Sequence, residues 1–306
     1  MSIIENAINK LQPAEGKGDK LHSGSAAIQK NASESLIERA IEKTVQPEIR
    51  SPHARVEVIE EPVIQSRHEN INLAKLKKMG VITPDAERSK IAEEFRLIKR
   101  PLLANAFGQG AAPIKNGNLI MVTSSLPGEG KSFCSINLAI SIALEMDRTV
   151  LLVDADVARP RILEYLGLKK DSLGLLDVLR DDKLELADVL IRTNIEKLSI
   201  LPAGQTYRHA TELLASEAMD ALLEDMGNRY PDRIIIFDSP PLLSTSEASA
   251  LATQMGQIVM VVEAEKTPQD AVKEALSRIE SCDVVGMLLN KTTSIPGSDY
   301  YGYYGS

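Results

Sequence analysis

An apolar run that breaks into a glycine-rich loop and then returns to helix-forming residues constrains this chain most. Residues 119–123 read Leu-Ile-Met-Val-Thr, and residues 127–132 read Pro-Gly-Glu-Gly-Lys-Ser. Glycines let backbone N–H groups close around phosphate oxygens, and the helix that follows points its positive N-terminal end at the same anion. The pattern therefore predicts a strand, a phosphate-binding loop and the start of a helix.

The loop also predicts the roles of its residues. We expect Lys131 to reach the β- and γ-phosphates and the Ser132 hydroxyl to ligate Mg²⁺. The general pattern has a further glycine five residues before Gly130, where this chain has Ser125, so the loop alone supports nucleotide binding without assigning a subfamily. A chance Lys-Ser pair after a Gly-Pro turn is the alternative. The predicted nucleotide-binding residues of the loop are Pro127, Gly128, Glu129, Gly130, Lys131, Ser132 and Phe133.

From Asn118 onward, apolar segments rich in β-branched residues alternate with helical patterns. The six predicted strands are residues 119–123, 149–154, 198–202, 233–238, 257–263 and 284–290. Their near-continuous hydrophobicity is typical of strands covered on both faces, and the spacers are long enough for helical crossovers. We expect an α/β fold with a doubly wound, mostly parallel sheet and ligands at the carboxyl ends of its strands.

Two predicted strands end in acidic residues. Asp154 and Asp156 follow one buried strand, and Asp238 ends another. The Mg²⁺ that neutralises nucleotide phosphates must be held by such groups, directly or through water. We therefore expect Ser132, Asp156 and Asp238 to hold the metal. The alternative is that these aspartates are only turn or cap residues.

Length and composition narrow the classes of protein. A chain of 306 residues allows one large α/β domain with additions, or two small domains, and 43% hydrophobic residues suffice for a core. The net charge of −8 argues against nucleic acid as a partner. No apolar run approaches the ~18 residues of a membrane span, and no signal-peptide pattern is present, so we expect a cytoplasmic protein. Cys134 and Cys282 are predicted to be core residues rather than a disulfide.

Residues 1–85 are rich in Glu, Lys, Asn, Ser and Gln and are predicted to form a flexible arm. The arm contains a near-repeat, because residues 2–11 match residues 35–44 at six of ten positions. Each copy carries an apolar stripe at i, i+1, i+4 and i+5, as in a short amphipathic helix. We expect these helices to dock on a partner protein; packing on their own domain is the alternative.

Three motifs together resemble the bacterial tyrosine kinases of exopolysaccharide systems. They are Ser-Leu-Pro-Gly-Glu-Gly-Lys-Ser at 125–132, Leu-Leu-Val-Asp-Ala-Asp at 151–156 and Phe-Asp-Ser-Pro-Pro at 237–241. The segment at 211–216 resembles the Glu-Leu-Leu helix start of that family. Gly-Val-Ile-Thr-Pro at 80–84 is similar to a segment of the exosortase-associated tyrosine autokinases. The resemblance spans about residues 72–306.

The resemblance implies a P-loop NTPase domain of the MinD/ParA-like type at residues 86–295, using ATP and Mg²⁺. It implies that Lys131, Asp156 and Asp238 are catalytic together with Asp154, which accepts the tyrosine proton. Asn290 resembles the base-contacting position of related nucleotide-binding folds; a turn residue at the end of a strand is the alternative. The transmembrane polysaccharide co-polymerase with which the family works would here be a separate chain.

A further motif of the resemblance, at Glu93, Arg96 and Lys99, implies assembly of subunits into a ring. Lys99 replaces the last arginine of this motif, and a point charge pairs less well with a carboxylate than a bidentate fork does. A second departure is Ala158, where the family has an arginine, with Arg159 next. Ring formation is therefore less strongly implied than nucleotide binding.

The tail at residues 296–306 holds four of the seven tyrosines of the chain, Tyr300, Tyr301, Tyr303 and Tyr304. They follow no strand or helix period, so the tail is predicted to be accessible. Beside a kinase-like site it is the expected phosphoacceptor, entering the site of a neighbouring subunit; a merely sticky tail is the alternative.

Two other functions compete with an autokinase. A nucleotide-switched positioning ATPase of the MinD/ParA type would carry a lysine where this chain has Leu126. A catalytically silent, ATP-binding scaffold of a polysaccharide assembly complex is the second, and the change at Ala158 is compatible with it.

Overall fold

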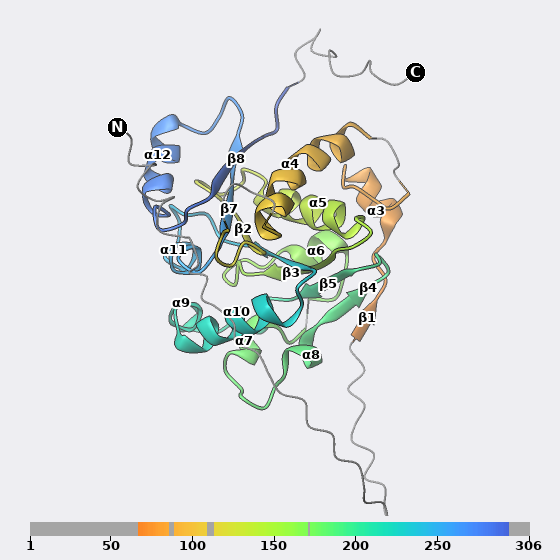
Figure 1. The fold of residues 1–306 in the computed structure, drawn as a ribbon, viewed down its shortest axis with the longest axis vertical. Helices are drawn as coiled ribbons and strands as arrows, with labels where there is room; N and C mark the ends of the chain where they lie inside the picture. The colour runs from red at the N-terminus through yellow and green to blue at the C-terminus, as the bar shows by residue number, and fades with distance from the viewer. Residues whose placement is uncertain (1–66, 86–88, 109–112, 171, 294–306) are drawn as a thin grey trace, which may run out of the picture. The chain divides into compact units, whose positions relative to one another are not determined.

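A computed structural model describes residues 67–85, 89–108, 113–170 and 172–293 of the chain, and Figure 1 shows their arrangement. The predicted arm helices at 2–11 and 35–44 and the tyrosine tail lie outside the described residues. The elements in chain order are β1 (Arg67–Glu69), α3 (Leu73–Lys78), α4 (Lys90–Ala106), β2 (Leu119–Ser124), α5 (Lys131–Ala143), β3 (Thr149–Asp154), α6 (Ile162–Leu166), α7 (Leu175–Val178), α8 (Leu186–Val189), β4 (Ile191–Thr193), β5 (Leu198–Leu201), α9 (Ala210–Leu214), α10 (Glu217–Arg229), β6 (Arg233–Asp238), α11 (Glu247–Ala252), β7 (Gln257–Glu263), α12 (Gln269–Ser277) and β8 (Val285–Asn290).

Eight strands form one sheet in the order β1-β4-β5-β3-β6-β2-β7-β8. All neighbouring strands are parallel except β4 and β5, which are antiparallel. The six predicted strands and the mostly parallel sheet are confirmed. β1 and β4 were not predicted, because each has three residues, too few to show a hydrophobic period.

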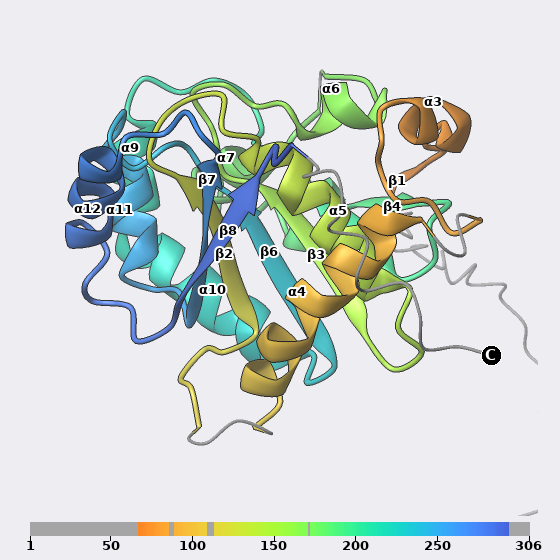
Figure 2. The same ribbon diagram turned by 90° about the horizontal axis from the view of Figure 1, so that it is seen from above.

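Helices cover both faces of the sheet, as Figure 2 shows from above, with α4 and α5 on one face and α10, α11 and α12 on the other. Alternate strand residues enter two separate cores, as expected from the period of two in a strand. On β2, Ile120 and Val122 face the first core, whereas Leu119 and Met121 face the second. This double cover explains why all six residues of β2 are buried and why its sequence is apolar throughout.

The folded domain begins earlier than the predicted boundary at residue 85. Residues 67–85 contribute a strand to the sheet and apolar side chains to the first core, among them Leu76 and Ile82. The Asn194 side chain accepts from the N–H of Ile71 at 2.8 Å and donates to its carbonyl at 3.1 Å. The sparse apolar positions of this segment thus pack against a distant part of the chain, which composition alone does not show.

Both cysteines are buried and free, which confirms the prediction that they are core residues. Burial raises the pKa of the Cys134 thiol to about 12, with a further contribution from the charge of Asp238. A thiol with this pKa is a poor nucleophile at neutral pH. Among the described helices, none is long and apolar enough to cross a membrane.

Gln257 joins the end of α4 to the sheet, and its replacement by leucine should destabilise the fold. Its fully buried side chain donates to the carbonyls of Leu102 at 3.0 Å and Gly117 at 2.6 Å and accepts from Asn105 at 2.9 Å. Loss of three buried hydrogen bonds should lower the free energy of unfolding by about 2–4 kcal/mol. Chemical denaturation measures this, with the exposed Gln269→Leu as the control; equal unfolding of both variants would contradict the assignment.

Candidate nucleotide site

Three neighbouring strands bring the predicted site residues to one edge of the sheet. Asp154 at the end of β3 is in register with Asp238 at the end of β6. Asp238 is in turn in register with Val122 of β2, the strand that leads into the glycine-rich loop. Since the carboxyl ends of parallel strands meet at one edge, the two aspartates and the loop lie together, as the sequence predicts.

The loop from Leu126 to Gly130 is shaped by its glycines and by one buried carboxylate. Gly128 and Gly130 have φ angles of 90° and 99°, in the left-handed region that favours glycine, and Gly130 is the N-cap of α5. Glu129 is only 2% exposed, and its carboxylate accepts from the N–H of Leu126 at 2.6 Å and from the Thr267 hydroxyl. Glu129 therefore links two ends of the loop through its buried carboxylate. Pro127 and Gly128, at the tip of the loop, are exposed.

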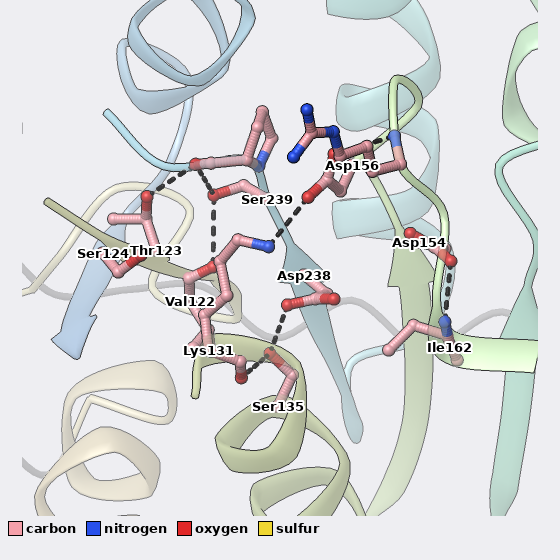
Figure 3. A network of polar contacts seen from close by, with 12 residues as sticks. Val122, Thr123, Ser124, Lys131, Ser135, Asp154, Asp156, Ile162, Asp238 and Ser239 are labelled. Carbon is pink, nitrogen blue, oxygen red and sulfur yellow. Dashed lines mark hydrogen bonds and ion pairs between the residues drawn. The ribbon is translucent and has the colours of Figure 1, made fainter. Parts of the chain in front are cut away.

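Lys131 is held by an acidic partner at the site (Figure 3). Its ammonium group lies 2.7 Å from Asp156 Oδ2, and the two side chains are only 12% and 8% exposed. The other oxygen of Asp156 accepts from the N–H of Arg159 at 3.1 Å. A bound phosphate would therefore share or displace this ion pair. Asp156 has further lone pairs on both oxygens with which it could ligate a metal.

Asp238 is fully buried in the centre of the site. Its Oδ1 accepts from the Ser135 hydroxyl at 3.0 Å, and its Oδ2 has no hydrogen-bond partner within the described residues. Burial raises the pKa of this carboxyl to about 6, although the charge of Lys131 and the neighbouring hydroxyls of Ser132 and Ser135 oppose the rise. Ser135 was not among the predicted site residues; it lies three residues after Ser132 on α5, and its hydroxyl donates to Asp238.

Asp154 lies beside Asp238 on the strand farther from the loop (Figure 3). Its Oδ2 accepts from the N–H of Ile162 at 3.0 Å, and its Oδ1 is buried with no partner among the described residues. Burial, followed by the charge of Asp238, raises the pKa of Asp154 well above its usual range. The site thus contains two neighbouring buried carboxyls, each with one oxygen free to accept a ligand or a proton.

The oxygen donors of the site suit Mg²⁺ together with a nucleotide. The described residues contain no group of three or more His, Cys, Asp or Glu side chains arranged to hold a metal ion. Magnesium does not require one, because it is commonly bound by one or two carboxylates, water and substrate phosphates. The free Oδ2 of Asp238 and the Ser132 hydroxyl fit this donor set.

The predicted assembly motif on α4 divides into two parts. Glu93 and Arg96 are partly exposed and pair with each other. The structure corrects the expectation for Lys99, which is 95% buried within its own subunit. Its ammonium group donates to the Ser141 carbonyl at 2.5 Å and lies 2.6 Å from Glu145 Oε1. Lys99 therefore anchors α4 to α5 instead of facing a neighbouring subunit.

The remaining predicted residues lie beside the loop. Phe133 packs partly against the first core and, with Asn290, lines a cavity of about 850 Å³ between α4 and β8. The Asn290 amide donates to the Glu129 carbonyl at 2.9 Å, and the next residue, Lys291, donates to the Gly128 carbonyl at 2.7 Å. Lys291 was not among the predicted site residues, although its position directly after Asn290 indicates that it lies near the loop.

The sequence of this chain is similar to those of known proteins. Residues 117–291 match the protein-family model AAA_31, described as an AAA domain. CapB of Staphylococcus aureus, which carries the name of a tyrosine-protein kinase, is 31% identical over 235 residues, or 75% of this chain and 98% of CapB. The succinoglycan biosynthesis transport protein ExoP of Rhizobium meliloti is 33% identical over 220 residues, or 70% of this chain and 27% of ExoP.

A solved structure is similar as well. The crystal structure of the chimerical protein CapA2B2 superposes with a TM-score of 0.60 at 26% identity, over 75% of this chain and 94% of that one. The chain therefore spans nearly all of CapB but only about a quarter of ExoP.

Proposed function

This chain belongs to the bacterial tyrosine-protein kinase family, and we propose that it transfers the γ-phosphoryl group of ATP to tyrosines of its own C-terminal cluster. The observation that carries the proposal is the convergence of the glycine loop, Lys131 and the buried Asp154 and Asp238 at one edge of the sheet. Phosphoryl transfer depends mostly on positioning and on charge stabilisation, which such a site supplies.

The proposed roles follow from the contacts. Loop amides and Lys131 bind the phosphates, with Lys131 leaving Asp156 for the β- and γ-phosphate oxygens. Ser132 and Asp238 hold Mg²⁺, with Asp156 close to it, and the metal supplies charge neutralisation at the phosphates. Asp154, with its partnerless Oδ1 and raised pKa, accepts the phenol proton as the tyrosine oxygen bonds to the γ-phosphorus and the bond to the ADP oxygen breaks.

The acceptors that we propose are Tyr300, Tyr301, Tyr303 and Tyr304, reached in trans. A segment of ten residues extends at most about 35 Å, so the tail can enter the site of a neighbouring subunit. Four phosphates would add about six to eight negative charges and favour release of the tail from an assembly. Glu93 and Arg96 remain the candidates for contact between subunits.

A biological setting follows from the relatives. ExoP is named for succinoglycan biosynthesis and transport, and a role in exopolysaccharide production is proposed for this chain also. The kinase would work on the inner face of the cell membrane, recruited by a transmembrane co-polymerase. Residues 80–84 support placing it with the exosortase-associated autokinases within the family.

Mixing two variants tests both the reaction and its direction. One chain carries Lys131→Met and an intact tail; the other has a parental site and phenylalanine at all four tail tyrosines. With Mg-ATP, we expect phosphotyrosine on the Lys131→Met chain in the mixture and none on either chain alone, as measured by mass spectrometry.

The parental protein serves as the positive control. Phosphotyrosine on the parent but not in the mixture would show that transfer occurs in cis. If the parent bound ATP without forming phosphotyrosine, the result would instead support the alternative function of a catalytically silent, ATP-binding scaffold. Phosphate on Tyr165, Tyr207 or Tyr230 in place of the tail would overturn the proposed acceptor.

A further inference from the structure

Two consecutive residues at the end of β8 hold two consecutive peptides of the glycine loop. Asn290 Nδ2 donates to the Glu129 carbonyl at 2.9 Å, and Lys291 Nζ donates to the Gly128 carbonyl at 2.7 Å. The partners lie 161 and 163 positions apart in the chain. These contacts therefore come from the tertiary fold and not from local turn geometry.

Planarity of the peptide group gives these contacts a consequence. In a trans peptide, the carbonyl of one residue and the N–H of the next point in opposite directions. Holding the Gly128 and Glu129 carbonyls toward β8 turns the N–H groups of Glu129 and Gly130 the other way. Within the part of the chain that the structure describes, neither N–H has a hydrogen-bond acceptor. Two such adjacent N–H groups form a concave site for an anion.

Both side chains make a further close contact at the site. Lys291 Nζ also lies 3.1 Å from Glu263 Oε2, which keeps the ammonium group beside the loop. Asn290 packs so closely on Gly130 that a Cβ there would lie 2.1 Å from Asn290 Nδ2. A cation on a carbonyl also polarises the peptide and strengthens its N–H as a donor.

We infer that Asn290 and Lys291 are positioning residues that orient the phosphate-binding amides of the loop. The inference rests on the proposed function, since it assigns these residues to the same nucleotide site. It differs from the base-contacting role expected for Asn290 from its likeness to related nucleotide-binding folds, because the amide of Asn290 donates to the loop itself.

Nucleotide and tripolyphosphate binding to the full chain tests this inference. We expect Lys291→Met to weaken binding of Mg-ATP and of inorganic tripolyphosphate by a similar factor, about tenfold for the loss of one charged hydrogen bond. The ratio of ATP to GTP affinity should stay unchanged, because the phosphates and not the base are affected. Lys291→Arg should restore most of the affinity.

Lys266 offers a matched control. It pairs with the same Glu263 at 3.2 Å, is 73% exposed, and makes no contact with the loop among the described hydrogen bonds. Lys266→Met should change both affinities by less than about twofold, as expected of a surface ion pair. An equal loss in the two variants would show a general charge effect and overturn the inference.

The remaining outcomes separate this inference from the proposed function. A parent that binds neither ligand would overturn both. A parent that binds both ligands while Lys291→Met binds them equally well would overturn only the inference. A changed ratio of ATP to GTP affinity in Asn290→Ala, with tripolyphosphate binding intact, would show that Asn290 contacts the base and does not orient the loop. If Lys291→Met lowers the unfolding temperature, Asn290→Ala takes its place in the same measurements of Mg-ATP and tripolyphosphate binding.

Discussion

Lys131→Met should reduce ATP-dependent tyrosine phosphorylation at least about 100-fold, because it removes a preorganised cation from the developing charge of the transferred phosphoryl group. It should also lower the free energy of unfolding by about 3 kcal/mol. The second effect arises because Asp156, only 8% exposed, loses its partner at 2.7 Å and becomes a buried, unpaired charge. Phosphotyrosine formation and chemical denaturation measure the two effects.

A double variant separates chemistry from folding. Lys131→Met combined with Asp156→Asn removes both charges of the pair, so its stability should return most of the way to that of the parent. Phosphorylation should stay lost. If the double variant recovered activity, the defect of Lys131→Met would be one of folding; if Lys131→Met kept parental activity, the lysine would have no role at the phosphates.

Asp238→Asn should show the opposite combination, with activity lost and the nucleotide-free protein more stable at pH 8. Activity falls because an amide oxygen is a weaker ligand for Mg²⁺ than a carboxylate. Stability rises because the parent must keep a fully buried carboxylate ionised, whereas the amide carries no charge to desolvate. Phosphotyrosine formation and denaturation without nucleotide test the two claims.

The stability difference should depend on pH in a defined direction. Asp238 has a pKa of about 6 in the folded protein against 3.8 ordinarily, so between these values the folded state binds more protons than the unfolded state. The parent therefore loses stability as pH rises from about 4 to 6, by about 3 kcal/mol at 1.4 kcal/mol per pKa unit. The advantage of Asp238→Asn should grow through this window and then level off.

A surface aspartate gives the control for this titration. Asp270 has a side chain that is 96% exposed, so Asp270→Asn should differ from the parent by a small amount that stays constant across the same pH range. An Asp238→Asn protein that is less stable than the parent at pH 8 would show that the hydrogen bond from Ser135 and the charge of Lys131 outweigh the burial of the carboxylate.

Much of the site was predictable because its parts are local. The glycine loop, the apolar strands and the aspartates that end them are patterns of at most about fourteen residues. Each reflects a local requirement, namely left-handed backbone at Gly128 and Gly130 and burial on both faces at β3 and β6. Parallel strands then place their ends together by topology alone.

The errors concern residues whose partners are distant in the sequence. The segment 67–85 is sparse in apolar residues, yet it joins the sheet next to β4. Lys99 is the last position of the predicted assembly motif. It is nevertheless buried, because Ser141 of α5 and Glu145 just beyond that helix hold its ammonium group. No local pattern contains these neighbours.

The sequence by itself determined the kinds of residue at this site and the strand ends that carry them, because backbone preference and hydrophobic period are properties of short segments. Only the tertiary structure decided that β6 lies between β3 and β2, that Lys131 pairs with Asp156, and that Asn290 and Lys291 orient the loop peptides. It also decided the raised pKa of Asp238, because desolvation depends on every segment packed around the carboxyl. The glycine loop alone predicts that phosphate binds, and the surrounding fold sets the direction of its amides and the charge beside them.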